Sequence, residues 1–577
     1  MTRPSTQVAT AAARPSAAAD QALAPVGAKT RRGSVVLPSL LSGVLMALSV
    51  PPWGFWPLAF AGGALFWWRL GGLGPRSRLL AGWALGLGLF LPGLWWATSF
   101  NVYGGIVLIV IESLLAPGVA ALVTPPGAGR SVALPGAMVL GEAIRSHWPF
   151  GGLPMGSIAL GQAASPLAAC ARLGGPLLVI GVTWLVGIAL GALAVTGARR
   201  WLGRRAPIDP AAGAVSTAAA ATGAIAVGGS TVPGSAAVAP AVTSRRTGLV
   251  AVTAVVVGIA VVLGATLAPA GGPTVGEIRV AAVQGGGRRG VSHIYVSPAT
   301  VFDAQLAATA MIGAVDRGRP PTLVLWPEDV VALPGPLSDS QAKPVLAELA
   351  RRHHASMVVG VTEDVGAAHF RNEAVAFSPS GSVIGHYEKV HRVPFGEYIP
   401  YRSFFSHLAN LSAVPRNAIP GHGDGVLRVP GAVLGTMISF EVFFPDRGRD
   451  PVVHGADLLI VPTNTSSYAT SQVPTQEVAA DQLQAIAEGR YLVQAAPSGY
   501  SDVVTPHGAV LQRSVLGRRQ VLVADVGLRH GLTVFARLGE VPTELAAGFF
   551  VAAGWLLWWR RRRTATEPWG WRPATAR

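Results

Sequence analysis

The 577-residue sequence contains a single cysteine, Cys170. One thiol excludes a disulfide framework and any site that needs two thiolates, so packing and hydrogen bonding must hold every part of the fold. Cys170 itself lies in or beside a long apolar run, where a small buried cysteine is the ordinary expectation. Charge is also scarce, because charged residues make up 13% of the chain, hydrophobic residues 50%, and mean hydropathy is +0.45. This composition is typical of a chain that is at least partly a membrane protein.

Apolar runs long enough to cross a bilayer are concentrated in the first half of the chain. A transmembrane helix needs roughly 20 apolar residues, and prolines or glycines interrupt several of these runs without excluding them. About seven spans are predicted before residue 271, and one more near the end of the chain. They cover residues 35–51, 55–70, 79–100, 103–123, 132–144, 167–195, 249–268 and 545–559.

Basic residues predict how these spans are oriented. Short loops rich in Lys and Arg stay on the cytoplasmic side of a membrane, and here such loops alternate with nearly uncharged ones. Examples are Arg76 and Arg78 between the second and third spans, and the arginine run 560–563 after the last span. Both termini are therefore predicted to be cytoplasmic. The net charge of +16 follows this topology, which argues against a nucleic-acid partner.

The same topology divides the chain into parts. We expect a disordered cytoplasmic N-terminus, a transmembrane domain, an extracytoplasmic domain, a final transmembrane helix and a basic cytoplasmic tail. Their bounds, in that order, are 1–34, 35–271, 272–541, 545–559 and 560–577. Within the transmembrane domain, residues 206–244 are rich in Ala, Gly, Ser, Thr and Pro and are predicted to form a flexible cytoplasmic loop.

The hydrophilic domain alternates between short strands rich in β-branched residues and helical stretches. Strands are predicted at 279–284, 322–326, 356–361, 374–378, 383–388, 433–440 and 457–462, and helices at 297–315, 346–353 and 476–491. Such alternation is typical of an α/β sandwich or a doubly wound sheet. No metal-ligating cluster, phosphate-binding loop or dinucleotide motif is visible, so neither a metal nor a cofactor is predicted.

Polar side chains lie at or just after the ends of three of the predicted strands. They are Glu328, Lys389 and Ser439. Strand ends hold side chains rigidly at an open edge of a sheet, which is where chemistry is usually found. A carboxylate, an amine and a hydroxyl supply the minimum set for acyl transfer: a base, a cation for the oxyanion and an atom that carries the acyl group.

The local sequence around these residues resembles that of the nitrilase superfamily. The matching motifs are VQG at 283–285, WPE at 326–328, YEKVHRVPFGEYIP at 387–400 and the FE that follows Ser439. With the membrane spans added, the chain resembles the apolipoprotein N-acyltransferases, the membrane-bound branch of that superfamily. The order and spacing of motifs and spans extend this resemblance over nearly the whole chain.

The resemblance implies a fold and an activity. The fold is a multi-pass α-helical membrane domain plus an extracytoplasmic nitrilase-like α/β sandwich with layers in the order α-β-β-α. The activity is transfer of an acyl chain from a phospholipid to the α-amino group of a diacylglyceryl-cysteine lipoprotein, the last step of lipoprotein maturation. It proceeds by a ping-pong acyl-enzyme mechanism without a cofactor, in the inner (plasma) membrane of a bacterium.

The resemblance also implies roles position by position. Glu328 is expected to be the general base, Lys389 to stabilise the oxyanion, and Glu397 to orient the lysine or assist the base. Ser439 falls on the nucleophile position. The supporting residues expected from the same motifs are Trp326, Phe440 and Glu441.

The segment that follows the lysine motif is predicted to form a lid over a lipid entrance. Residues 401–420 are longer than most structural loops and carry apolar side chains, among them Phe404, Phe405 and Leu408. Packing on the domain is the alternative interpretation. The stretch 147–154, on the outer side after the fifth span, is expected to line the same entrance. Within it, Trp148 is expected to line that entrance or to lie at the membrane interface.

Ser439 departs from the resemblance, because a nucleophilic cysteine is expected there. A thiol has a pKa near 8.5 and a free hydroxyl is far less acidic, so a glutamate that activates cysteine is a poorer base for serine. The exchange should cost orders of magnitude in rate. Three interpretations stay open: an introduced substitution that silences the enzyme, an active natural serine variant, or a relative that binds lipid or acts as a scaffold without turnover.

Two further hypotheses concern other activities and partners. A membrane-tethered amidase-type hydrolase would use water in place of the amine acceptor. Some actinobacterial relatives resemble partners of a polyprenol-phosphate mannose synthase, so an assembly with such an enzyme is also a hypothesis.

Overall fold

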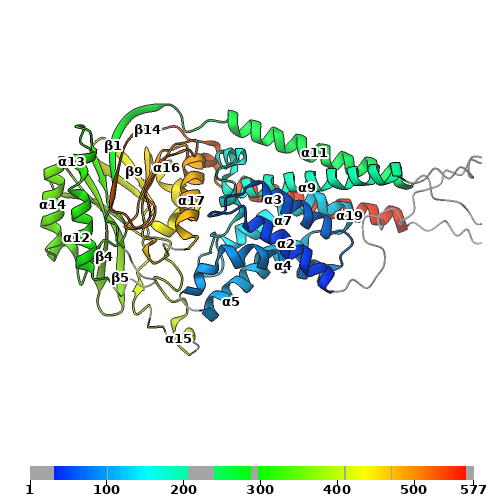
Figure 1. Cartoon of the computed structure of the whole chain (residues 1–577), viewed down its shortest axis with the longest axis horizontal. Coiled ribbons are helices and arrows are strands. Elements are labelled where there is room, and N and C mark those ends of the chain that lie inside the picture. The colour runs from blue at the N-terminus through cyan, green and yellow to red at the C-terminus, as the bar shows by residue number, and fades with distance from the viewer. Residues whose placement is uncertain are drawn as a thin grey trace, which may run out of the picture.

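A bundle of helices and a β-sandwich lie end to end along the long axis of the molecule (Figure 1). The computed structural model describes residues 32–99, 102–205, 239–287, 296–407, 411–412, 414–468 and 471–566. Residues 1–31 of the predicted disordered segment 1–34, residues 206–238 of the predicted loop 206–244 and most of the basic tail lie outside these residues. The remaining parts of the first two predictions are wrong, because 32–34 begin helix α2 and 239–244 begin helix α11.

A helix or a run of helices corresponds to each predicted span. The helices of the bundle are α2 (Arg32–Ala47), α3 (Pro57–Arg69), α4 (Pro75–Gly93), α5 (Val102–Ser113), α6 (Val119–Val123), α7 (Arg130–Arg145), α8 (Ile158–Gly161), α9 (Ala171–Arg205), α11 (Ala239–Leu267) and α19 (Val541–Thr566). A π-turn over Leu114–Gly118, which contains Pro117, joins α5 to α6. Glycines allow close helix packing, because a Cβ at Gly43 of α2 or Gly88 of α4 would collide with the backbone of the facing helix.

Several helices are long and apolar enough to cross a membrane by length and composition. In the described residues these are Val102–Val123, Pro166–Ala198, Val541–Arg563 and Pro298–Val315, with shorter apolar helices at Gly33–Ala47 and Ala251–Leu267. The segment Pro298–Val315 is different from the others, since it packs on the outer face of the sandwich and contributes Ala308 and Ile312 to the core there.

Two separate sheets form the sandwich. The first has eight strands, in the order β14-β1-β2-β4-β5-β6 with β3 paired to β4 and β7 to β5, and the second has six, in the order β13-β12-β11-β10-β9-β8. The strands are β1 (Thr274–Gln284), β2 (Leu323–Leu325), β3 (Val331–Leu333), β4 (Ser356–Val365), β5 (His369–Phe377), β6 (Val383–Glu388), β7 (Asn417–Ala418), β8 (Val426–Val429), β9 (Ala432–Thr436), β10 (Leu458–Pro462), β11 (Leu492–Ala495), β12 (Asp502–Val504), β13 (Val510–Arg513) and β14 (Gln520–Arg529).

Helices cover the outer face of each sheet, which gives the predicted layer order α-β-β-α. The first sheet is covered by α12 (Pro298–Thr309), α13 (Ile312–Val315) and α14 (Ala342–His353), and the second by α16 (Pro445–Val453) and α17 (Val473–Glu488). Residues such as Leu325 and Ile460 form the core between the sheets. The sandwich prediction is therefore confirmed, and the doubly wound alternative is wrong because the strands divide into two facing sheets.

Two predicted elements end earlier than expected. The helix predicted at 297–315 starts as expected, with Ser297 as its N-cap, where Ser297 Oγ accepts a hydrogen bond from Thr300 N at 3.2 Å, but it is interrupted between α12 and α13. The strand predicted at 433–440 ends at Thr436, because the chain turns sharply at Ser439.

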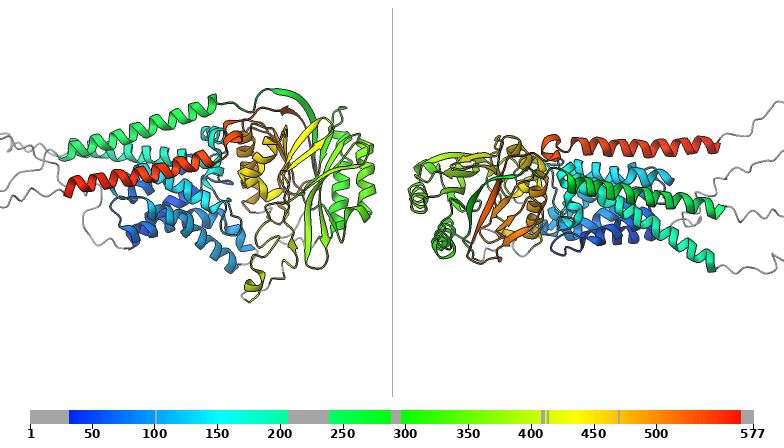
Figure 2. Two further views of the ribbon diagram at one scale, coloured as in Figure 1. Left: turned by 180° about the vertical axis from the view of Figure 1, so that it is seen from behind. Right: turned by 90° about the horizontal axis from the view of Figure 1, so that it is seen from above.

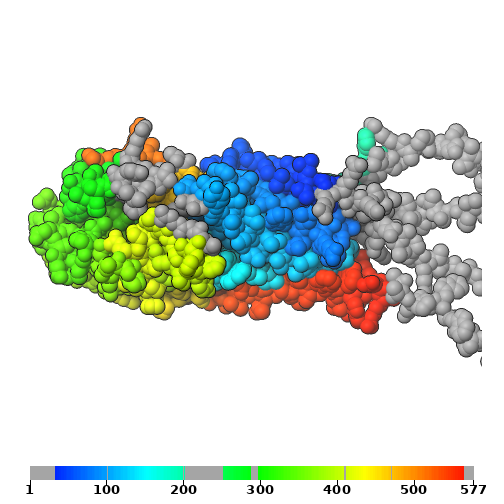
Figure 3. Space-filling model, turned by 90° about the horizontal axis from the view of Figure 1, so that it is seen from below, coloured from blue at the N-terminus to red at the C-terminus, as the bar shows by residue number. Residues whose placement is uncertain are grey.

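The second sheet's helix layer joins the sandwich to the bundle. Gln476 of α17 donates to Gly93 O at 3.0 Å and accepts from Gly156 N at 2.9 Å, and Gln472 donates to Pro92 O at 3.0 Å. One hydrophobic core runs from the bundle into α17 without interruption. Figures 2 and 3 show the sandwich in contact with one end of the bundle, so the two parts form a single packed body.

Candidate active site

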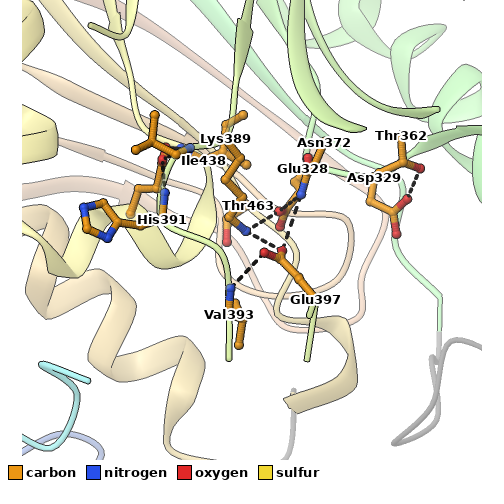
Figure 4. Close-up of polar contacts among 12 residues, drawn as sticks. Glu328, Asp329, Thr362, Asn372, Lys389, His391, Val393, Glu397, Ile438 and Thr463 are labelled. Atoms are coloured by element: carbon orange, nitrogen blue, oxygen red, sulfur yellow. Dashed lines mark hydrogen bonds and ion pairs between the residues drawn. The ribbon is translucent and has the colours of Figure 1, made fainter. Parts of the chain in front are cut away.

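A buried ion network lies where β2 and β6 end. Lys389 follows β6, and its Nζ lies 2.8 Å from Glu328 Oε1 and 2.6 Å from Glu397 Oε1 (Figure 4). The lysine side chain is only 1% exposed. A buried ammonium is tolerated only when opposite charges and hydrogen bonds surround it, and the two carboxylates supply both. The structure thus brings together three of the residues predicted from the sequence.

Asn372 completes this network from the neighbouring strand β5. Its Nδ2 donates to Glu328 Oε1 at 2.7 Å and to Glu397 Oε1 at 3.4 Å. The other oxygen of Glu397 accepts from Val393 N at 2.9 Å. The sequence reasoning missed Asn372. The sequence pattern of β5 could have indicated it, because side chains alternate between the two faces of a strand. This alternation places Asn372 on the same face as the apolar residues of the inner core.

Burial and charge act in opposite directions on these groups. Burial lowers the pKa of Lys389, but Glu328 and Glu397 together outweigh it and raise that pKa above its ordinary value. Burial raises the pKa of Glu397, against the opposing effect of Lys389. The lysine therefore stays an ammonium across the physiological range, as a group that stabilises negative charge must.

Ser439 lies at a strained turn between β9 and a 3₁₀ helix over Ser439–Phe443. Its φ is +53°, in the left-handed region that a non-glycine residue rarely adopts. Such a conformation costs of order 1–3 kcal/mol and persists only where the surroundings impose it, often at functional sites. A strand followed by a residue in a strained turn and then a helix is also how other folds present a nucleophile.

Glu441 fixes this turn against the strand end that carries Lys389. Its carboxylate accepts from Ile438 N at 2.8 Å on one side, and from Val390 N at 2.7 Å and His391 N at 3.0 Å on the other. Tyr387 OH donates to both carboxylate oxygens at 3.0 Å. Burial raises the pKa of Glu441, while the backbone N–H groups oppose that effect. Glu441 thus connects residue 439 to the Lys389 network.

The other two predicted supporting residues serve packing. Trp326 is fully buried in the outer core of the first sheet, where its Nε1 donates to Thr309 Oγ1 at 3.0 Å and its ring lies 5.9 Å from that of Phe302. Phe440 is buried against Phe444, with ring centroids 5.0 Å apart. Both side chains hold the backbone on which Glu328 and Ser439 are placed.

The predicted lid contains one short helix, α15 (Arg402–Phe405). Phe405 packs edge-on against Phe395 of the lysine motif at 5.2 Å, whereas Phe404 is 60% exposed and contacts Phe405 at 5.3 Å. Leu408 lies outside the described residues. The predicted lid segment therefore packs on the domain through Phe405 and exposes the aromatic side chain of Phe404.

A loop from the bundle meets this segment through Phe150, two residues after Trp148 in the stretch 147–154 that was predicted to line the entrance. The Phe150 ring lies 5.6 Å from Phe395, 6.3 Å from Tyr401 and 6.4 Å from Phe405. Trp148 is 55% exposed, as an interfacial residue would be. Phe150, Phe395 and Tyr401 all have positive φ, at 57°, 60° and 45°. These four rings, at positions 150, 395, 401 and 405, are called the aromatic cluster below.

Buried charge in the bundle holds the Phe150 loop in place. Arg145 donates to Leu153 O and, at 3.0 Å, to Met155 O. Its guanidinium pairs with Glu142 at 2.6 Å and lies 3.8 Å from Glu112. Tyr398 OH in turn donates to Phe150 O at 2.9 Å. The loop is thus fixed from the bundle at its far end and from the lysine motif at its tip.

Another buried carboxyl, that of Glu477, lies behind the network. Thr463, which follows β10, donates to Glu477 of α17. Burial raises the pKa of Glu477 to about 8, and the charge of Glu328 adds to that effect. Tyr468 is partly buried, and burial together with the charges of Glu397 and Glu328 raises its pKa; its ring lies 5.4 Å from Trp96 of the bundle. The site is therefore enclosed partly by residues of the bundle.

Two family models match the chain. Residues 303–530 match carbon-nitrogen hydrolase, which places the sandwich and its site in the nitrilase superfamily. Residues 42–192 match the apolipoprotein N-acyltransferase N-terminal domain. Among solved structures, Saccharomyces cerevisiae Nit3, a member of branch 10 of the nitrilase superfamily, aligns at 19% identity and a TM-score of 0.34 over 44% of this chain and 91% of that chain.

Curated relatives cover most of the chain. An apolipoprotein N-acyltransferase of Pseudomonas putida is 26% identical over 541 residues, which are 90% of this chain and 95% of the relative. One of Mycolicibacterium smegmatis is 28% identical over 514 residues, 86% of this chain and 81% of the relative. The chain belongs to the apolipoprotein N-acyltransferase family, a family of membrane-bound enzymes in the nitrilase superfamily. The predicted family and fold class are confirmed.

Proposed function

We propose that the protein moves an acyl chain from a phospholipid to the α-amino group of a diacylglyceryl-cysteine at the N-terminus of a lipoprotein. One observation carries the proposal: Glu441 ties the strained turn at Ser439 to the strand end that presents Lys389 beside Glu328. The names of the relatives support the reaction class.

In the first half-reaction, Ser439 Oγ attacks the ester carbonyl of the phospholipid while Glu328 takes the hydroxyl proton. The Lys389 ammonium stabilises the negative charge that develops on the carbonyl oxygen. Collapse of the tetrahedral intermediate breaks the bond to the glycerol oxygen, which leaves as a lysophospholipid after receiving the proton from Glu328. The acyl chain is then held as an ester on Ser439.

In the second half-reaction, the α-amino nitrogen of the lipoprotein attacks that ester. Glu328 accepts the proton of the amine and returns it to Ser439 Oγ as the amide forms. Glu397 and Asn372 keep the lysine and the base oriented between the two steps, since both contact the same pair of groups. No cofactor is needed in either step.

The aromatic cluster supports a lipid entrance at the junction of sandwich and bundle. Its rings come from a bundle loop, the lysine motif and the lid segment, so an acyl chain that leaves the bilayer beside the bundle would meet apolar side chains first. We propose that the protein lies in the bacterial plasma membrane with both termini cytoplasmic and the sandwich outside. Figure 1 supports this arrangement, since α19 ends at the end of the bundle opposite the sandwich.

The test is acyl transfer by the purified full chain and by Ser439→Cys and Ser439→Ala. Each is incubated with phospholipid, searched by mass spectrometry for an acyl group on residue 439, and then given a diacylated lipopeptide. We expect the acyl group on Ser439 and on the cysteine variant, faster N-acylation with cysteine by orders of magnitude because the thiol is more acidic, and neither product with alanine. An acyl group or product with Ser439→Ala would overturn the proposal.

The hydroxyl at position 439 favours a second candidate, a relative that binds lipid without turnover. This candidate predicts no acyl group on Ser439. It also predicts that N-acylation occurs only in Ser439→Cys, or in neither that variant nor the unaltered chain. Release of free fatty acid without N-acylation would instead indicate an amidase-type hydrolase. A partnership with a polyprenol-phosphate mannose synthase stays a hypothesis, which co-purification from the native membrane would test.

A further inference from the structure

The strands that carry the active site present a second group of polar residues on their opposite face. In a β-strand, neighbouring side chains point to opposite faces. Asn372 of β5 and Lys389 after β6 point toward the active site, so Glu373 and Glu388, which adjoin them in sequence, point away from it. The opposite face is the outer one, where β5 also contributes Val375 and Phe377 to the core under α14.

Strand register places three potential metal ligands together on that face. Glu373 and Glu388 are direct partners across the antiparallel pair, and His386, two residues before Glu388, is the partner of Val375. One ligand atom from each of Glu373, His386 and Glu388 lies within 4.8 Å of the other two. Paired strands are rigid, so this spacing does not depend on a mobile loop.

Glu373 is buried in an arrangement that calls for a positive partner. Its exposed fraction is 8%. Among the described residues, the only side chain that hydrogen-bonds its carboxyl is another carboxyl, that of Glu363, and such a contact needs a shared proton or a cation.

Arg371 forms its ion pair with Glu388 and not with the carboxylate of Glu373. Its Nε lies 3.4 Å from Glu388 Oε1, and both side chains are substantially exposed, at 44% and 31%. Exposed pairs of this kind contribute little stability. Glu388 is therefore free to exchange this partner for a metal ion.

We propose that Glu373, His386 and Glu388 bind a zinc ion on the outer face of the first sheet. An imidazole with two carboxylates suits zinc, which takes three protein ligands and a water in a tetrahedral site, whereas calcium and magnesium prefer oxygen ligands alone. The ion neutralises the crowded carboxylates and cross-links the edge strand β6 to β5. Because these strands hold Lys389 and Asn372 on their other face, the site is a structural support behind the active site.

The test is zinc binding by the full chain purified in detergent and stripped with a chelator. Competition with a chromophoric chelator measures affinity, metal analysis measures stoichiometry, and thermal unfolding is followed with and without zinc. We expect one zinc per chain, a melting temperature raised by zinc, and affinity at least about tenfold weaker in both His386→Ala and Glu388→Gln. His369→Ala, which removes an exposed histidine from the same strand β5, should bind zinc like the unaltered chain.

Four outcomes would contradict the proposed zinc site. They are no zinc bound by the unaltered chain, equal affinity in His386→Ala, equal loss in His369→Ala, or calcium bound as tightly as zinc. Because His386 is exposed, its alanine variant should fold normally, and its melting temperature without zinc verifies this. Zinc affinity is measured without any acyl transfer, so this result is independent of the proposed function.

Discussion

At the scale of single residues, the backbone conformation and the side-chain chemistry of position 439 have separate causes. The backbone there adopts a left-handed conformation, which the bonds of Glu441 impose from outside whatever atom the side chain carries. The hydroxyl changes the acidity of the attacking atom and the reactivity of the ester formed. The backbone conformation is therefore independent of the side-chain atom, while the proposed chemistry depends on that one oxygen.

Strain at this position predicts an order of stability among variants. Ser439→Gly and Ser439→Ala both remove the hydroxyl, but only glycine adopts a φ of +53° without a steric penalty. We expect the glycine variant to be the more stable of the two by about 1 kcal/mol, since strain relief exceeds the entropy that glycine costs. Thermal or denaturant unfolding in detergent checks this order, and a more stable alanine variant would show that the turn is not strained.

Glu477 predicts a pH dependence of stability. Its pKa is raised from an ordinary value of 4.5 to about 8 in the folded protein. Between these values the folded state holds a proton that the unfolded state has lost, so the free energy of unfolding falls as pH rises, by about 1.4 kcal/mol per pH unit for one group. Stability is highest below the unfolded pKa and this contribution is lost by about pH 8.

Glu477→Gln keeps the acceptor for Thr463 and removes the titration. The decline in melting temperature from pH 5 to 8 should become shallower in this variant, whereas Glu277→Gln, at an exposed position of β1, should leave it unchanged. An unaltered slope in Glu477→Gln would mean that other groups cause the decline.

At the scale of elements, loops from different parts of the chain build the aromatic cluster, where we propose the lipid entrance. The Phe150 loop is held by Arg145 in the bundle, and the lid segment packs on it through Phe405. Helix α17 joins the same two bodies behind the site through Gln476. A change in the bundle can therefore reach the active site along either contact.

Phe150 and Trp148 form a matched pair for testing the entrance. Phe150→Ala removes a ring that contacts three others, so we expect a raised KM for phospholipid and a loss of about 2 kcal/mol or more in stability. Trp148→Ala removes an exposed ring and should leave both quantities nearly unchanged. Initial rates against phospholipid concentration and thermal unfolding measure the two effects. Equal effects of the two substitutions would contradict the role given to Phe150.

At the scale of the whole molecule, a long bundle holds the sandwich at one end and the last described residues of α19 at the other (Figure 1). If the bundle crosses the membrane, these two ends lie on opposite sides. The single cysteine, Cys170, is fully buried in the described structure. Labelling of one introduced cysteine therefore reports which side of the membrane that cysteine lies on, without interference from Cys170.

Cysteine labelling tests this topology. Ser338→Cys, exposed on the sandwich, should react with a membrane-impermeant maleimide in intact cells. Ser77→Cys, near the start of α4, should react only after the membrane is permeabilised. The unaltered chain, with Cys170 alone, serves as the unlabelled control. The reverse pattern would place the sandwich in the cytoplasm.

Much of the molecule was predictable from short stretches of sequence. Apolar runs predicted the helices of the bundle, and alternating strands and helices predicted an α/β domain. The motifs that resemble the nitrilase superfamily predicted the sandwich, and polar residues at strand ends indicated Glu328, Lys389 and Ser439. Each of these signals is local, because hydrophobic periodicity and strand ends are read within about 20 residues. Two strand ends differ from the prediction by several residues: β4 runs four residues past 361 to Val365, and the strand predicted at 433–440 ends at Thr436. At Ser439, hydrogen bonds that Glu441 accepts from Val390 N and His391 N override the propensity for an extended chain.

The sequence by itself determined the family, the two-part architecture and the placing of Glu328 and Lys389 just after strands of the sandwich. Only the tertiary structure decided that Asn372 joins the ion network, that Phe150 and not Trp148 meets the lysine motif, and that Glu373 lies beside His386. The bond from Tyr398 to Phe150 joins positions 248 residues apart. Such contacts arise from the packing of whole elements, and no local pattern records which distant element will lie alongside.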